Sequence, residues 1–167
     1  MNFLNWPRAK TSIILSTAVM VFLFAVSAFA AGSKPMKPAA KDKCPVCGMF
    51  VAKYPDFVAQ IHFRDGSSAF FDGVKDMLKY YRNISRYASG RKLADVSAIY
   101  VTDYYSLGQI DGYKAYYVSG SDVFGPMGKE LVPFGKKADA LEFMKDHKGR
   151  AILGFRDVNA AVMKSLD

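Results

Sequence analysis

The chain has 167 residues, 51% of them hydrophobic, and a formal net charge of +8 at pH 7. This length suits one domain or two small halves. The positive charges lie beside acidic residues on expected helix faces, which indicates a solvated surface and no nucleic-acid partner. With two histidines and no nucleophile-elbow, zincin or phosphate-loop motif, the sequence does not predict an enzyme.

The N-terminal segment, residues 1–30, is expected to be an export signal. Arg8 and Lys10 form a positive region, residues 11–31 carry no charge, and Ala28-Phe29-Ala30 fits a small-x-small cleavage site. The alternative is an uncleaved membrane anchor, because the apolar run is long enough to span a bilayer. In both cases the rest of the chain is expected in the periplasm or another extracytoplasmic space.

Residues 31–43 contain two prolines and several lysines and are expected to form a polar linker. An N-terminal metal-binding half, residues 44–92, is expected to follow. In it, strands over 57–63 and 68–71 flank a hairpin turn at Asp65-Gly66. A helix then begins at Asp72, which is a plausible N-cap, and ends near Tyr87.

The C-terminal half, residues 93–167, is expected to repeat this plan. Strands are predicted over 99–102, 114–118, 131–134 and 151–155, and helices over 138–147 and 158–166. Pro133 confines its strand to a sheet edge or a strand end. An offset of 63 residues aligns Phe71 with Phe134 and Leu78 with Leu141. The predicted class is therefore α+β, with two small related halves, each a β-hairpin packed with a helix.

The segment Cys44-Pro45-Val46-Cys47-Gly48-Met49 holds both cysteines of the chain and a methionine. Soft sulfur ligands select Cu(I), Zn(II) or Fe–S centres, and a thioether favours Cu(I). The C-x-x-C spacing lets two thiolates approach one metal. Gly48 allows the backbone to turn both neighbouring sulfurs toward one point.

A structural zinc site needs four ligands, and beyond the cysteines only His62 and His147 remain, which are far apart in sequence. Cu(I) accepts fewer ligands, so His62 is the candidate imidazole. The alternative for His62 is a half-buried strand histidine. Alternation along the strand places it on the polar side, facing the sulfur loop. His147 is expected at a helix C-terminus, where it complements the dipole. Met127 is expected in a glycine-flanked turn, where a hydrophobic plug is favoured over a metal ligand.

Two further functions stay open at this point. A periplasmic thiol–disulfide oxidoreductase would use Cys44 and Cys47, although such motifs usually open a helix after a strand. In the second alternative, a zinc ion or a disulfide between the same cysteines staples an interaction module, since an oxidising compartment permits a disulfide.

The ordered blocks of the chain resemble the NosL family, the accessory lipoproteins of nitrous oxide reductase. The blocks that carry the resemblance are Cys47-Gly48-Met49, Ala59-Gln60-Ile61-His62, Val101-Thr102-Asp103, Tyr117-Val118, and Gly125 to Phe134. The resemblance implies an extracytoplasmic Cu(I)-binding chaperone with two related α+β halves.

By position, the resemblance implies that Cys47 and Met49 are metal ligands and that His62 is the imidazole ligand. The chain departs from the family in having no lipid-attachment cysteine. Cys44 is an additional thiol and is a candidate fourth ligand, redox partner or guard thiol.

The sequence therefore predicts an exported metallochaperone, not an enzyme. Its cofactor is Cu(I), held by Cys47, Met49, His62 and Cys44. The expected partner is a copper-accepting metalloenzyme or a copper-transport protein, reached by stepwise ligand exchange. A membrane contact is expected only through the N-terminal segment, if that segment is not cleaved.

Overall fold

The computed structural model describes residues 34–167, so the expected export signal lies outside the described residues. Within residues 34–167, no helix combines the length and the apolar character needed to cross a bilayer. The described residues belong to one compact unit.

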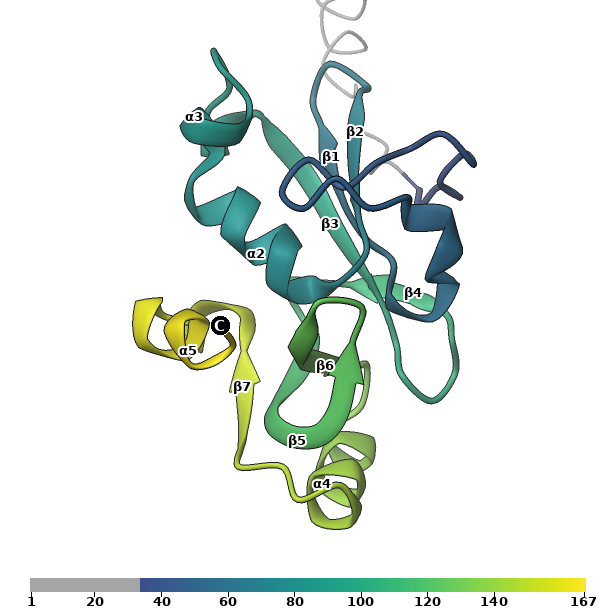
Figure 1. Cartoon of the computed structure of the whole chain (residues 1–167), viewed down its shortest axis with the longest axis vertical. Coiled ribbons are helices and arrows are strands. Elements are labelled where there is room, and N and C mark those ends of the chain that lie inside the picture. Colours follow the sequence, from purple (N-terminus) through teal and green to yellow (C-terminus); the bar gives the residue numbers. More distant parts are fainter. Residues whose placement is uncertain (1–33) are drawn as a thin grey trace, which may run out of the picture. The chain divides into compact units, whose positions relative to one another are not determined.

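The first sheet has four antiparallel strands in the order β2-β1-β3-β4 (Figure 1). The strands are β1 (Ala59–Phe63), β2 (Ser68–Phe71), β3 (Val96–Thr102) and β4 (Gln109–Asp111). Helices α2 (Val74–Arg82) and α3 (Ile84–Tyr87) follow β2. Helix α2 packs against β1 and β2 through its buried residues Val74, Met77 and Leu78, which are spaced as an amphipathic helix requires.

The second sheet has three antiparallel strands in the order β6-β5-β7. They are β5 (Tyr116–Gly125), β6 (Gly128–Phe134) and β7 (Ala151–Gly154). Helix α4 (Lys137–Asp146) lies against this sheet, and α5 (Ala160–Ser165) closes the chain (Figure 1). Strand β6 is an edge strand, as the proline at position 133 predicts, because proline cannot donate a ladder hydrogen bond.

The predicted α+β class is confirmed, and the hairpin–helix unit occurs twice, as β1-β2-α2 and β5-β6-α4. The offset of 63 residues places the first residue of α2 on the first residue of α4. The predicted boundary between the two halves, after residue 92, does not separate the two sheets. Strand β3 lies beyond residue 93 but pairs with β1 in the first sheet. The short strand β4 was not predicted.

The main hydrophobic core draws on both sheets. Phe71 and Met77 from the first hairpin–helix unit pack in one cluster with Tyr117 and Leu131 from the second. A smaller cluster beneath α4 contains Phe134 and other residues of the second sheet. Because the main core is shared, the two hairpin–helix units stabilise each other.

Part of the expected linker is held against the first sheet. The Gln60 side-chain oxygen accepts a hydrogen bond from the Met36 backbone N–H at 2.8 Å, and the Gln60 amide donates to the Met36 carbonyl at 3.1 Å. Lys43 also forms an antiparallel bridge with Phe50. These contacts give residues 36–43 a defined path that their polar composition did not predict.

The start of α2 differs from the prediction. Gly73, not Asp72, is the N-cap residue, and it supplies no side-chain cap. A carboxylate from β6 takes that role: Glu130 Oε1 accepts hydrogen bonds from the backbone N–H groups of Lys75 at 2.6 Å and Leu131 at 2.9 Å. Burial raises the pKa of Glu130 to about 7.

The raised pKa of Glu130 predicts a pH-dependent stability. The folded protein binds this proton more tightly than the unfolded chain, so the free energy of unfolding should fall as pH rises from about 4.5 to about 7. The expected change is on the order of 3 kcal/mol. Urea unfolding gives the free energy of unfolding of the parent and of Glu130→Gln across this pH range. The difference between the two isolates the effect of Glu130, because the contributions of the other titratable groups cancel. A difference that is constant with pH would contradict it.

Candidate metal centre

The two cysteines lie in a tight loop closed by backbone hydrogen bonds. The Cys44 N–H donates to the Met49 carbonyl at 2.9 Å, and the Gly48 N–H donates to the Cys44 carbonyl at 2.8 Å. Gly48 has a φ of +81°, in the left-handed region that glycine adopts without a steric cost. The turn therefore directs both thiols toward the same side, as the C-x-x-C-G pattern predicted.

The first turn of α2 faces this loop. The Cys44 thiol donates to Asp76 Oδ2 at 3.4 Å, and the Cys47 thiol donates to Asp72 Oδ1 at 3.1 Å. Asp76 lies in the first turn of α2, and Asp72 lies just before the N-cap Gly73, so both carboxylates are at the N-terminal end of the helix. The positive end of the helix dipole stabilises carboxylates at this position.

Together, the four side chains form a compact donor group. One ligand atom from each of Cys44, Cys47, Asp72 and Asp76 lies within 4.8 Å of the others. Cys44 and both aspartates are buried, and Cys47 is half-buried. Asp72 Oδ2 is a buried oxygen without a hydrogen-bond partner. Such an oxygen is costly to bury unless a ligand or an ion satisfies it.

Both thiols hold their protons tightly in the metal-free protein. Burial raises the pKa of Cys44 to about 12, and the neighbouring carboxylate of Asp72 contributes to the shift. Burial also raises the pKa of Cys47 far above its ordinary value, with contributions from Asp72 and Asp76. A metal that binds as a thiolate complex must therefore displace these protons.

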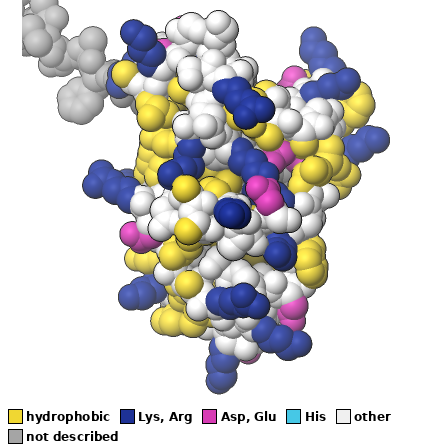
Figure 2. Space-filling model, turned by 60° about the vertical axis from the view of Figure 1, so that its left-hand side comes forward, with side chains coloured by type: hydrophobic (Ala, Val, Ile, Leu, Met, Phe, Trp, Pro, Cys, Tyr) yellow, Lys and Arg dark blue, Asp and Glu magenta, His cyan; other side chains and the backbone are white. Residues whose placement is uncertain are grey.

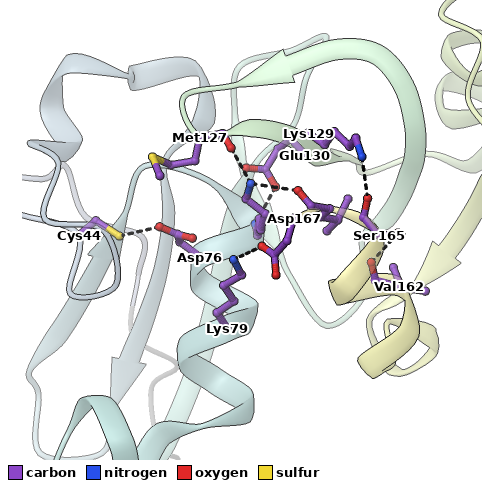
Figure 3. Close-up of polar contacts among 11 residues, drawn as sticks. Cys44, Asp76, Lys79, Met127, Lys129, Glu130, Val162, Ser165 and Asp167 are labelled. Carbon is purple, nitrogen blue, oxygen red and sulfur yellow. Dashed lines mark hydrogen bonds and ion pairs between the residues drawn. The ribbon is translucent and has the colours of Figure 1, made fainter.

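Two methionines accompany the sulfur loop. Met49 is half-buried at the end of the loop. Met127 comes from the turn between β5 and β6 and is 45% exposed. In Figure 3, its sulfur points toward the side on which Cys44 and Asp76 lie. The Lys75 ammonium on α2 holds this turn by donating to the Met127 carbonyl at 2.6 Å.

His62 is placed differently from what alternation along the strand suggested. It is 2% exposed, and its Nε2 shares a hydrogen bond with Gln60 Oε1 at 2.7 Å. It is not a member of the cysteine–aspartate group found among the described residues. Burial lowers the pKa of His62, which keeps the imidazole neutral. His147 lies at the C-terminal end of α4, as predicted, and its ring contacts Asp122.

Neither aspartate was predicted to belong to the site. Asp72 was expected to cap the helix, and only histidines were considered as further zinc ligands, although carboxylates also bind zinc. A usable signal was present, since Asp72 and Asp76 flank a predicted helix start, where carboxylates are favoured. The sequence does not show that the sulfur loop packs against this end of the helix.

The fold and this group of donors define a class: an α+β protein with a candidate thiol–carboxylate metal site at the N-terminal end of a helix. The chain belongs to the NosL family, since the sequence model of that family, described as NosL, matches residues 35–163.

A curated relative, the copper-binding lipoprotein NosL of Stutzerimonas stutzeri, is 28% identical over 134 residues. The match spans 74% of this chain and 65% of the relative, so less than two thirds of the relative's length is covered. The crystal structure of the copper chaperone NosL from Shewanella denitrificans has a similar fold, with a TM-score of 0.66 and 21% identity. That similarity covers 77% of this chain and 97% of the solved chain.

The raised thiol pKa values predict slow alkylation of the metal-free protein. At pH 8, iodoacetamide should modify both cysteines far more slowly than a free thiol, because only the thiolate reacts. Asp72→Asn removes a negative charge beside Cys47 and should speed its modification about two- to fivefold. Mass spectrometry of quenched samples gives the rate at each cysteine. Asp146→Asn, on the exposed end of α4, is the control, and equal rates in both variants would contradict the thiol–carboxylate contact.

Proposed function

We propose that this chain is a Cu(I)-binding chaperone of an extracytoplasmic compartment and not an enzyme. The observation that carries the proposal is the meeting of Cys44 and Cys47 in one loop, with a thioether at position 49 and a second thioether at the neighbouring turn. Thiolate and thioether sulfurs prefer Cu(I) among the common protein metals. The printed names of the two relatives, copper-binding and copper chaperone, support the same choice.

The proposed primary ligands are the sulfurs of Cys47, Met49 and Cys44. Ligation by His62 through Nε2 requires that its hydrogen bond to Gln60 break first. Met127 lies on an exposed turn and requires no such rearrangement. We therefore keep His62 as a proposed ligand and add Met127 as the competing third or fourth donor.

The aspartates give the site a mixed character. Their oxygens suit harder ions, and two thiolates with two carboxylates also satisfy the coordination number of zinc. This donor group therefore favours a second candidate function, an interaction module that a structural zinc ion stabilises. Zinc held by all four protein ligands would exchange slowly, whereas Cu(I) on two or three sulfurs leaves room for an incoming ligand.

Transfer of copper needs an accessible edge. Cys47 and Met49 are half-buried. Phe50, which follows Met49 in sequence, and Met127, in the turn between β5 and β6, are exposed. A partner's sulfur ligand can attack the metal from this side while Cys44 remains buried. Each departing thiolate can regain its proton, so the ligands are replaced one at a time.

The proposed partner is a copper-accepting metalloenzyme or transport protein. Phe50, next to Met49, is 40% exposed, and the Lys43 and Lys53 ammonium groups lie 4.8 and 5.7 Å from its ring centre. An aromatic side chain flanked by cations suits an acidic acceptor surface. Elsewhere, lysine and arginine side chains are spread over the face shown in Figure 2 and do not form one stripe.

The oxidoreductase alternative is less consistent with the site. Catalytic C-x-x-C thiols have lowered pKa values because they lie at a helix N-terminus or beside cations. Here the pKa values of both thiols are raised by burial, and each thiol faces a carboxylate. In this environment the thiols stay protonated when no metal is bound, and protonated thiols are poor nucleophiles toward a disulfide.

The proposal predicts one Cu(I) per reduced chain. Anaerobic titration against a Cu(I) chelator should saturate near one equivalent. Cys47→Ser should abolish tight binding, since it removes the thiolate of the Cys47-Gly48-Met49 pair to which the family resemblance assigns ligation, and Cys44→Ser should weaken binding modestly. A parallel Zn²⁺ titration distinguishes the second function. Equal loss with both serine variants, together with zinc binding that outcompetes Cu(I), would favour the zinc-stapled module.

A second set of variants identifies the additional donor. His62→Ala should weaken Cu(I) binding if the imidazole ligates, and Met127→Leu should weaken it if the thioether does. Each lost ligand is expected to cost about tenfold or more in affinity. His147→Ala serves as the histidine control. X-ray absorption of the loaded protein counts nitrogen and sulfur neighbours, and unchanged affinity and spectra in His62→Ala would remove His62 from the site.

A further inference from the structure

The aspartates of the metal centre depend on a helix terminus that has no cap of its own. Gly73 is the N-cap of α2 and has no side chain to accept the first N–H groups. Such groups need partners from elsewhere in the fold. Glu130 provides one by accepting from the Lys75 N–H at 2.6 Å, across a separation of 55 residues along the chain.

Glu130 fits closely between two glycines. A Cβ atom at Gly73 would overlap Glu130 Oε2, and a Cβ atom at Gly125 would lie 3.0 Å from the Glu130 side chain. Gly73 has a φ of −168°, which any residue adopts. The space taken by the Glu130 carboxylate, not the backbone conformation, therefore excludes alanine at position 73.

Lys75 adds a second connection from the same turn of α2. Its ammonium donates to the Met127 carbonyl at 2.6 Å and to the Leu166 carbonyl at 3.4 Å. The Lys75 side chain is 5% exposed. Both the backbone and the side chain of Lys75 are thus held by the C-terminal part of the chain, directly beside Asp76.

We infer that Glu130 is a positioning residue of the metal centre. It fixes the first turn of α2 so that Asp72 and Asp76 meet Cys47 and Cys44, and it touches neither thiol in the hydrogen bonds of the described residues. Its effect on Cu(I) affinity rests on the proposed function. Its effect on the geometry of the metal-free site does not.

The first measurement uses the metal-free full chain. Glu130→Ala should raise the rate at which iodoacetamide modifies Cys47 about fivefold, the factor that corresponds to one lost helix-capping interaction. Glu130→Gln retains an acceptor of the same size and should restore most of the parent rate. Phe143→Leu, in the separate cluster beneath α4, is the control for a general loss of stability.

A double-mutant cycle tests the contact itself. Gly73→Ala should displace the Glu130 carboxylate and raise the rate as Glu130→Ala does. In Glu130→Ala the space is free, so adding Gly73→Ala should change little. Gly108→Ala is the glycine control, since a Cβ there meets its nearest neighbour at an ordinary 3.4 Å. Additive effects of the two substitutions would overturn the inference.

Cu(I) affinity measured on the same variants separates the two proposals. If the parent chain binds no Cu(I), the proposed function fails, while the alkylation rates still decide the role of Glu130. If the parent binds Cu(I), Glu130→Ala and Gly73→Ala should each weaken binding about fivefold or more. If Glu130→Ala does not fold, Gly73→Ala and Glu130→Gln provide the comparison. Parent-like alkylation in folded Gly73→Ala overturns the inference.

Discussion

Cys44 and Cys47 donate hydrogen bonds to Asp76 and Asp72, and these two contacts join the sulfur loop to the first turn of α2. Four potentially anionic groups share one largely buried corner, which is stable only when protons or a cation reduce the charge. In the metal-free chain, the thiol protons do so. The metal, the protons and the position of the loop are therefore coupled, because a change in one alters the other two.

Much of the fold follows from local pattern. The Asp65-Gly66 turn and the apolar, β-favouring segments around it specify β1 and β2, and the apolar spacing of Val74, Met77 and Leu78 specifies α2. The offset of 63 residues places the second strand and the helix of the first unit on β6 and α4, but it does not place β1 on the paired part of β5. The pairing of β3 with β1 was not predicted, because register between distant strands depends on tertiary contacts that no local window contains.

The candidate site was predicted only in part. The C-x-x-C spacing predicted that Cys44 and Cys47 come together, as they do in the donor group, since thiols close in sequence leave a visible signature. Ligation by Met49 stays a prediction. Asp72 and Asp76 were missed because their role depends on the docking of a loop that lies more than twenty residues earlier. Alternation along the strand predicted that His62 and Ile61 lie on opposite sides of β1. It did not predict that Gln60 and the segment at Met36 cover the side on which His62 lies.

The distance in sequence between the sulfur loop and Glu130 has a consequence for biogenesis. A chain made from its N-terminus presents residues 44–49 long before residue 130, and domains of this kind complete their packing late. During that interval, the cysteines exist without the helix terminus that holds their aspartate partners. Newly made chains therefore pass through a stage in which the thiols are open to oxidants and stray metals, and completion of the β5–β6 hairpin ends it.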